Sequence, residues 1–160
     1  MDAMTIRLAE PKDAAAVSQL VNAAYSKWIP VTGREPMPML ADYPALIAQQ
    51  VVYVAEDGEI VGVLVIWPMN ENNSLYIDNL AVRPDHQRLG IGEFLLNFAE
   101  GQAREMKLPI LSLMTNEKME YNQAFYRKHG FAETRRETIS EGRRAVWMHK
   151  PVSSDKKALS

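Results

Sequence analysis

The chain has 160 residues, of which 47% are apolar and 24% charged, and this composition is typical of one compact domain. It contains no cysteine, which excludes disulfides, cysteine nucleophiles and thiolate metal ligands. The formal net charge at pH 7 is −2, and both signs are interspersed along the chain. No broad basic face for nucleic acid is therefore expected.

Two further features bear on where the protein works. The segment Met1–Glu10 lacks the charged start, apolar core and cleavage site of a signal peptide. The longest apolar run, Ile60–Trp67, is far shorter than the roughly 20 residues that span a bilayer. We therefore expect a cytoplasmic protein with no membrane association.

The predicted elements of the first part of the chain begin with a short strand at Thr5–Leu8. An amphipathic helix starts near Asp13, and its apolar positions keep helical spacing as far as Trp28. The segment Ile29–Ala41 is rich in proline and is expected to hold no regular element. A short helix is predicted over Pro44–Gln50.

Three strands are predicted in the middle of the chain. Asp57-Gly58 is a hairpin turn signal between a strand at Val51–Ala55 and a return strand at Ile60–Trp67. The return strand is almost unbroken in its apolar character, which indicates burial on both faces of a sheet. A polar turn then leads into a fourth strand over Leu75–Val82.

The remaining elements alternate between helix and strand. Gly90 and Gly92 precede a long amphipathic helix that Pro109 closes. A further helix is predicted from about Lys118 to His129, with Gly130 as its C′ residue. The predicted strands in this part are Ile110–Met114, Phe131–Glu137 and Ala145–His149, the last two joined around Glu141-Gly142.

This order of elements predicts an α/β (α+β) fold. A mixed, mostly antiparallel central sheet of about seven strands would be flanked by about four helices. Residues 1–150 would form a single domain, and residues 151–160 a polar, disordered tail.

The most informative segment links the fourth strand to the long helix. It ends in Gln87-Arg88-Leu89-Gly90-Ile91-Gly92, where glycines let the backbone approach an anion at a helix start. A dinucleotide-binding loop would need a third glycine at Leu95, and a P-loop would need Gly-Lys-Ser/Thr in place of Ile91-Gly92-Glu93. Spacing alone leaves two interpretations open, a diphosphate cradle and a plain turn whose glycines allow tight packing.

The same segment resembles the Gln/Arg-x-x-Gly-x-Gly/Ala motif of the GNAT superfamily of N-acetyltransferases. The preceding Leu80–Pro84 matches that family's usual lead-in, and Tyr126 with Gly130-Phe131 resembles its Tyr-x-x-x-Gly-Phe signature. The resemblance covers about residues 5–150. One departure is Leu89, where many relatives carry a basic residue, although neighbouring Arg88 can supply that charge.

The resemblance implies a GNAT-like acyl-CoA N-acyltransferase fold and a reaction. Acetyl-CoA would be the co-substrate, without a metal, and the acetyl group would pass to a primary amine by direct attack in a ternary complex. Loop amides would hold the coenzyme diphosphate, and the fourth strand and later residues would hold the pantetheine arm. The coenzyme-binding residues implied are Leu80, Ala81, Val82, Gln87, Arg88, Leu89, Gly90, Ile91, Gly92, Asn116, Asn122 and Tyr126. For Asn116 and Asn122, helix capping and turn formation remain the alternative.

Two catalytic residues follow from the resemblance. Tyr126 would donate a proton to the departing thiolate, and the alternative is a core tyrosine on an amphipathic helix. Asp78 occupies the strand position where many relatives place a glutamate, so it would deprotonate the amine, directly or through water. The alternative for Asp78 is a strand-end carboxylate bonded to a backbone group.

The acceptor side would lie beside the proline-rich segment. Arg34 could bind a substrate carboxylate, and Asp42 an ammonium group. The alternative is a lid packed by Trp28 and the prolines. The substrate-binding residues predicted are Tyr25, Trp28, Arg34 and Asp42.

Other functions remain open at this stage. The acceptor could be a small molecule or a peptide, and a homodimer is neither required nor excluded. A noncatalytic acyl-CoA-binding sensor is the main alternative, followed by an acyltransferase that uses another acyl-CoA or a hydroxyl acceptor. The histidines show no metal-ligand spacing, so no metal is expected.

Overall fold

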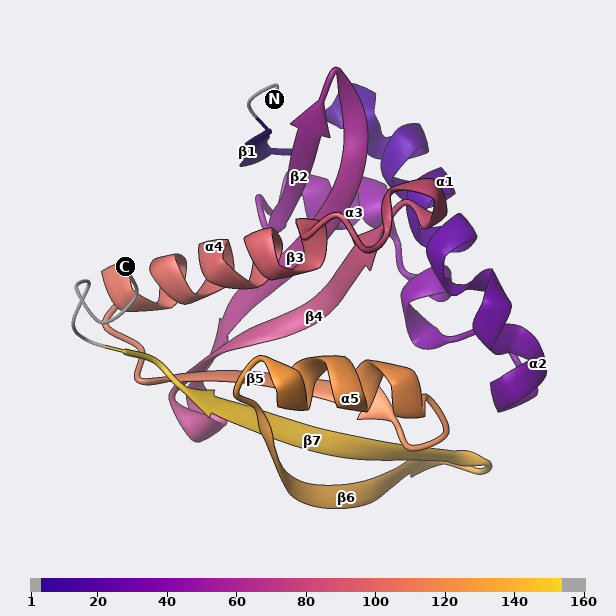
Figure 1. The fold of residues 1–160 in the computed structure, drawn as a ribbon, viewed down its shortest axis with the longest axis vertical. Helices are drawn as coiled ribbons and strands as arrows, with labels where there is room; N and C mark the ends of the chain where they lie inside the picture. The colour runs from indigo at the N-terminus through magenta and orange to yellow at the C-terminus, as the bar shows by residue number, and fades with distance from the viewer. Residues whose placement is uncertain (1–3, 154–160) are drawn as a thin grey trace. The chain divides into compact units, whose positions relative to one another are not determined.

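The computed structural model describes residues 4–153 and contains seven strands and five α-helices among them (Figure 1). Short 3-10 turns connect several of these elements. The strands are β1 (Thr5–Leu8), β2 (Val52–Asp57), β3 (Glu59–Met69), β4 (Ser74–Val82), β5 (Ile110–Asn116), β6 (Ala132–Ser140) and β7 (Arg143–Pro151). The helices are α1 (Ala14–Tyr25), α2 (Ile29–Thr32), α3 (Tyr43–Ala48), α4 (Ile91–Glu105) and α5 (Glu120–Lys128).

The strands form one seven-stranded sheet in the order β1-β2-β3-β4-β5-β7-β6. The pairs β1–β2, β2–β3, β5–β7 and β7–β6 are antiparallel, whereas β4 and β5 run parallel over Ser74–Ile77 and Ile110–Leu113. The prediction of a mixed, mostly antiparallel sheet of about seven strands is therefore confirmed.

The chain divides into two compact units. The first contains the residues up to Ile66 together with Asp78–Leu96, and the second contains Trp67–Ile77 with the residues from Asn97 onward. The boundary passes through β3, β4 and α4, so each of these elements contributes to both units.

In the first unit, the core is built on β3. Residues Val61–Ile66 are all buried, as the unbroken apolar run predicted. Gly62 is required at a close approach of the strand to α4, because a Cβ there would lie 3.0 Å from Leu95 Cδ1 and 3.2 Å from Ile91 Cγ2. This contact seats the first turns of α4 directly on the sheet.

The proline-rich segment of the first unit differs from the prediction. Residues 29–41 were expected to lack regular structure, but they contain α2 and a 3-10 turn at Met37–Leu40. Both begin with a proline in the first two positions, where the missing N–H costs no hydrogen bond. Gly33 ends α2 in the left-handed conformation (φ 82°), and the Thr32 hydroxyl hydrogen-bonds back to the Trp28 carbonyl at 3.0 Å.

In the second unit, α5 precedes the long β6–β7 hairpin (Figure 1). Gly130 has φ 99° and is the C′ residue of α5, as predicted. Its N–H donates to the Arg127 carbonyl at 3.1 Å, and the Phe131 N–H donates to the Tyr126 carbonyl at 3.0 Å. These two bonds form a Schellman motif that closes the helix.

The segment predicted as a disordered tail is partly ordered. Pro151 belongs to β7, and the Val152 N–H donates to the Pro109 carbonyl at 2.8 Å. The Ser153 N–H donates to the buried carboxylate of Glu100 at 3.1 Å, and this carboxylate also pairs with Lys150 at 3.0 Å. The rest of the predicted tail lies outside the described residues.

Candidate functional site

The start of α4 provides the backbone donors that an anion site needs. The Phe94 N–H donates to the Gly90 carbonyl at 3.0 Å, which makes Gly90 the residue before the first helical turn. The N–H groups of the following turn have no partner within a helix. Arg88 and Gly90 both have a positive φ, 69° and 83°, so the chain winds tightly into the helix. Such a loop presents successive N–H groups on one side, as anion-binding loops do.

One side of the loop packs against β3, and the other side is exposed to solvent. Ile91 is buried against Gly62, which fixes the first turn of the helix. Gly90 is exposed, and a Cβ placed on it would meet no atom of the described residues within 4 Å. Leu89 is 68% exposed. A bulky anionic group could therefore approach the backbone here without displacing a side chain.

The segment that leads into the loop is held by β4 and its neighbours. The Arg83 N–H donates to the Val61 carbonyl at 2.9 Å, and the Arg83 guanidinium pairs with Glu59 and Asp85. The predicted pantetheine-binding strand already uses two of its carbonyls. The Leu80 carbonyl accepts from the Tyr25 hydroxyl at 3.2 Å, and the Val82 carbonyl accepts from the Gln87 amide at 3.4 Å. A further hydrogen bond to either would use its second lone pair.

Asp78 stands in β4, four residues before Val82, and is half-buried. Its carboxylate makes no hydrogen bond or ion pair with any residue that the structure describes. Burial without a partner raises the pKa of Asp78 to about 6. No backbone group among the described residues binds this carboxylate, and burial brings its pKa closer to neutral pH than that of an exposed aspartate.

Tyr43 and Asn79 lie next to this carboxylate; the sequence places Tyr43 only beside the proline-rich segment and gives no role to Asn79. The Tyr43 hydroxyl donates to the Pro38 carbonyl at 2.6 Å and accepts from the Asn79 amide at 2.8 Å. Burial raises the pKa of the Tyr43 phenol far above its usual value, and the charge of Asp78 raises it further. Tyr43 therefore stays neutral, and its hydrogen bonds join the proline-rich segment to β4.

The four residues predicted to bind the acceptor are all in the first unit, but in different settings. Tyr25 is buried and bonded to β4 as described above. Trp28 is half-buried, with the Lys27 ammonium 5.5 Å from its ring centre. Asp42 is exposed and caps α3, since its carboxylate accepts from the Ala45 N–H at 3.1 Å. Arg34 is exposed.

The second unit carries Tyr126 on the buried face of α5. Its ring packs edge-on against Phe125 at 5.3 Å and Phe131 at 5.5 Å between ring centres. The turn at Gly130 brings Phe131 back onto the helix, which gives the Tyr-x-x-x-Gly-Phe pattern a packing role. Burial raises the pKa of Tyr126 above its ordinary value of 10.0, so the phenol keeps its proton. Its hydroxyl makes no hydrogen bond within residues 4–153.

Asn116 ends β5 and forms the turn before α5. Its side-chain carbonyl accepts from the Lys118 N–H at 2.8 Å, which is the turn-forming role that the sequence left as an alternative. The side-chain NH₂ of Asn116 is not used by this bond. Asn122 is half-buried in α5, and its backbone N–H donates to the Met119 carbonyl at 3.1 Å. Gln123, which sequence reasoning missed, binds the same turn.

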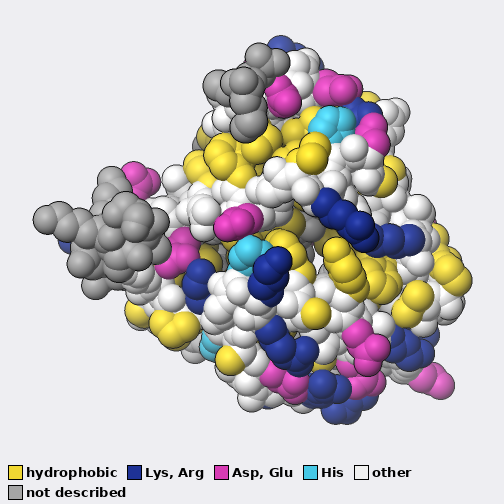
Figure 2. All heavy atoms as spheres, viewed as in Figure 1, with side chains coloured by type: hydrophobic (Ala, Val, Ile, Leu, Met, Phe, Trp, Pro, Cys, Tyr) yellow, Lys and Arg dark blue, Asp and Glu magenta, His cyan; other side chains and the backbone are white. Residues whose placement is uncertain are grey.

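Residues 4–153 show no sign of two other kinds of site. No three side chains of histidine, cysteine, aspartate or glutamate lie close enough together in this range to hold a metal ion. No helix in the described range is long and apolar enough to cross a membrane. On the face shown in Figure 2, lysine and arginine side chains lie among aspartates, glutamates and apolar groups.

Comparison with solved structures shows the same fold in several acetyltransferases. Nourseothricin acetyltransferase is 27% identical to this chain, with a TM-score of 0.59. The match covers 64% of this chain and 65% of that protein, so this chain spans less than two thirds of the length of nourseothricin acetyltransferase. The ribosomal-protein-S18-alanine N-acetyltransferase of Escherichia coli is 20% identical with a TM-score of 0.72, and the match covers 99% of each chain. The PaiA N-acetyltransferase of Thermoplasma acidophilum, solved in complex with coenzyme A, is 16% identical with a TM-score of 0.70, covering 93% of this chain and 99% of that one.

The sequence comparison identifies the family. No match was found among curated proteins. Residues 16–131 match the family described as Acetyltransferase (GNAT) family, and this range holds the loop before α4, Asp78 and Tyr126. The chain therefore belongs to the GNAT acetyltransferase family.

Proposed function

We propose that the protein transfers the acetyl group of acetyl-CoA to a primary amine by direct attack in a ternary complex. The observation that carries this proposal is the start of α4. A family motif there combines free helix N–H groups with Gly90, whose left-handed backbone faces open space. A diphosphate is the part of acetyl-CoA that such a site suits.

The coenzyme would bind in two places along the chain. The amides of Gln87–Gly92 would surround the diphosphate, where a positive helix end and the absence of a side chain at Gly90 favour close contact. The backbone of Leu80–Val82 and the NH₂ groups of Asn116 and Asn122 would bind the pantetheine arm. The coenzyme A complex of the Thermoplasma acidophilum relative supports this choice of co-substrate.

Asp78 would act as the general base. A primary amine with a pKa near 10.4 is about 99.9% protonated at pH 7 and cannot attack a thioester in that form. The Asp78 carboxylate has no partner among the described residues and a pKa of about 6, so at pH 7 it is mostly ionised and able to take a proton. Because aspartate is one methylene shorter than glutamate, we propose that a water relays the proton.

Tyr126 would act as the general acid. A thiolate leaving group with a pKa near 8.5 needs only modest help, which a neutral phenol supplies by donating its proton as the carbon–sulfur bond breaks. Backbone N–H groups of β4 would stabilise the oxyanion of the tetrahedral intermediate. The chain has no cysteine, so an acetyl-cysteine intermediate is ruled out, and of the remaining routes we propose direct attack of the amine on the thioester rather than transfer by way of another residue.

The acceptor would be the amine of a small molecule or a peptide, bound beside Tyr25, Trp28, Arg34 and Asp42. The solved relatives named above include enzymes whose names point to nourseothricin and to an alanine of ribosomal protein S18, so relatives with this fold differ in their acceptors. Thiol release from acetyl-CoA across a panel of amines tests the proposal. Tight binding of acetyl-CoA with no release by any amine would favour the noncatalytic sensor instead.

The cradle itself is tested by a matched pair of glycine variants. Gly90 and Gly58 both have a left-handed backbone, φ 83° and 77°, and a Cβ on either meets nothing within 4 Å. Gly90→Ala and Gly58→Ala should therefore each lose about 1–2 kcal/mol of stability through backbone strain. Only Gly90→Ala should raise the Kd for acetyl-CoA, by about tenfold or more, which is about 1.4 kcal/mol. Equal Kd values for the two variants would refute the cradle.

A further inference from the structure

Helix α5 has one polar residue in an otherwise apolar buried stripe. Met119, Gln123 and Tyr126 are all buried, and their spacing of four and three residues places them on one side of the helix. Gln123 is only 4% exposed. A buried amide is retained only where its hydrogen bonds are satisfied, so its partners show what it does.

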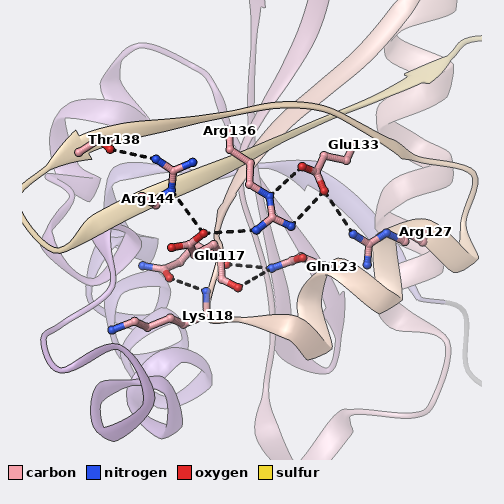
Figure 3. A network of polar contacts seen from close by, with 9 residues as sticks. Glu117, Lys118, Gln123, Arg127, Glu133, Arg136, Thr138 and Arg144 are labelled. Atoms are coloured by element: carbon pink, nitrogen blue, oxygen red, sulfur yellow. Dashed lines mark hydrogen bonds and ion pairs between the residues drawn. The ribbon is translucent and has the colours of Figure 1, made fainter.

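The amide of Gln123 joins α5 to the end of the preceding strand. Its nitrogen donates to the Asn116 carbonyl at 3.2 Å and to the Glu117 carbonyl at 3.0 Å. The Met119 N–H donates to the same Asn116 carbonyl at 3.0 Å. Figure 3 shows Gln123 pointing from the helix to the turn that holds Glu117 and Lys118. One buried side chain therefore binds two successive carbonyls of the connection between β5 and α5.

A second set of contacts surrounds this connection. The Glu117 carboxylate pairs with Arg136 at 3.3 Å and with Arg144 at 3.5 Å. The backbone N–H of Glu117 donates to the Arg144 carbonyl at 3.0 Å. Arg136 lies between Glu117 and Glu133, and it binds Glu133 at 2.8 Å (Figure 3). These charged side chains are 30–47% exposed, so water and salt screen them. The buried amide of Gln123 therefore holds the turn more strongly than they do.

We propose that Gln123 is a positioning residue for Tyr126, an inference that rests on the proposed role of Tyr126 as the general acid. A helix of nine residues is not stable alone, so contacts at its two ends decide where its side chains stand. The Schellman motif holds the end after Tyr126, and Gln123 holds the end before it. Proton donation needs heavy atoms within about 2.6–3.2 Å, and a shift of about 1 Å can cost about 100-fold in rate.

The experiment replaces Gln123 by methionine, which has nearly the same shape but no donor. Gln19→Met makes the same change on the exposed part of α1 and serves as the control. For each variant, kcat, the acceptor KM and the Kd for acetyl-CoA are measured in the natural chain and in Tyr126→Phe. We expect Gln123→Met to lower kcat about tenfold or more in the natural chain, with KM and Kd within about twofold. In Tyr126→Phe it should change kcat by less than about twofold, because no proton donor remains to be misplaced.

The outcomes separate a positioning role from a purely structural one. A loss of kcat that is the same in both backgrounds, or an unchanged kcat in the natural chain, overturns the inference. If Tyr126→Phe alone keeps full kcat, Tyr126 is not the general acid, and the inference about Gln123 fails with it. This result is obtained without changing Gln123, so it is distinguishable from a failure of the positioning role alone. Gln123→Asn keeps an amide that is too short to reach both carbonyls. It supplies the same comparison if the methionine variant yields too little folded protein.

Discussion

Ionisation of Asp78 should lower the free energy of unfolding at neutral pH, where the proposed base must be ionised. Its pKa is raised from 3.8 to about 6 by burial, so the folded chain holds this proton more tightly than the unfolded chain does. The stability linked to the protonated form is fully present below pH 3.8 and is lost as the pH rises through about 6. Asparagine does not ionise, so Asp78→Asn should remove that loss.

The size of the effect follows from the shift. About two pKa units at roughly 1.4 kcal/mol each give a ceiling of about 3 kcal/mol at pH 7. At pH 4 the folded state is still protonated and the unfolded state is only about half ionised, so the same calculation gives less than about 1 kcal/mol. Relative to the natural chain, Asp78→Asn should therefore become more stable by about 2 kcal/mol between pH 4 and pH 7.

The assay is urea unfolding of both proteins at several pH values, with turnover measured alongside. Removing a general base costs roughly 10²–10⁴-fold, so Asp78→Asn should be more stable at pH 7 and nearly inactive. Asp57→Asn, at the exposed β2–β3 turn, is the control and should keep full turnover. A stability difference that does not change between pH 4 and pH 7 would show that the carboxylate is not desolvated, and retained turnover would refute its role as the base.

Two other substitutions test the acid and the seating of α4. Tyr126→Phe should lower kcat about 100-fold, at the lower end of the range for general acids, with an unchanged Kd for acetyl-CoA; a full kcat in steady-state assays would remove Tyr126 from the mechanism. Gly62→Val should lower the free energy of unfolding by about 1–3 kcal/mol and weaken acetyl-CoA binding, because the side chain would push against Ile91 and Leu95. Gly101→Ala, in the later part of α4 where a Cβ would make only an ordinary contact with Arg104 at 3.9 Å, should instead raise stability by about 0.5–1 kcal/mol, and equal effects of the two would contradict the packing described for Gly62.

The sequence predicted much of the fold because local signals determine those elements. The hairpin at Asp57-Gly58, the doubly buried run in β3 and the C′ glycine of α5 all depend on residues close together in the chain. The proline-rich segment was predicted wrongly because proline was counted only as a breaker. At the first positions of α2 and of the 3-10 turn, proline removes no hydrogen bond and favours the helical backbone.

The candidate site could be predicted only where a motif marks it. The loop before α4 and Tyr126 belong to short patterns, and Asp78 was selected by its place before them. Tyr43 and Asn79 are 36 residues apart, so neither periodicity nor spacing indicates that they bond. Gln123 did leave one signal, a polar residue between Met119 and Tyr126 on an apolar stripe, which the sequence reading did not use.

The most direct test of direct amine attack follows the acetyl group. The protein is mixed with acetyl-CoA alone and then with an accepted amine, while free thiol, acetylated amine and the intact mass of the protein are measured together. We predict that no thiol is released and no acetyl group joins the chain without the amine. With it, each thiol released should match one acetylated amine. An acetylated protein formed from acetyl-CoA alone, whose acetyl group then passes to the amine, would contradict direct attack.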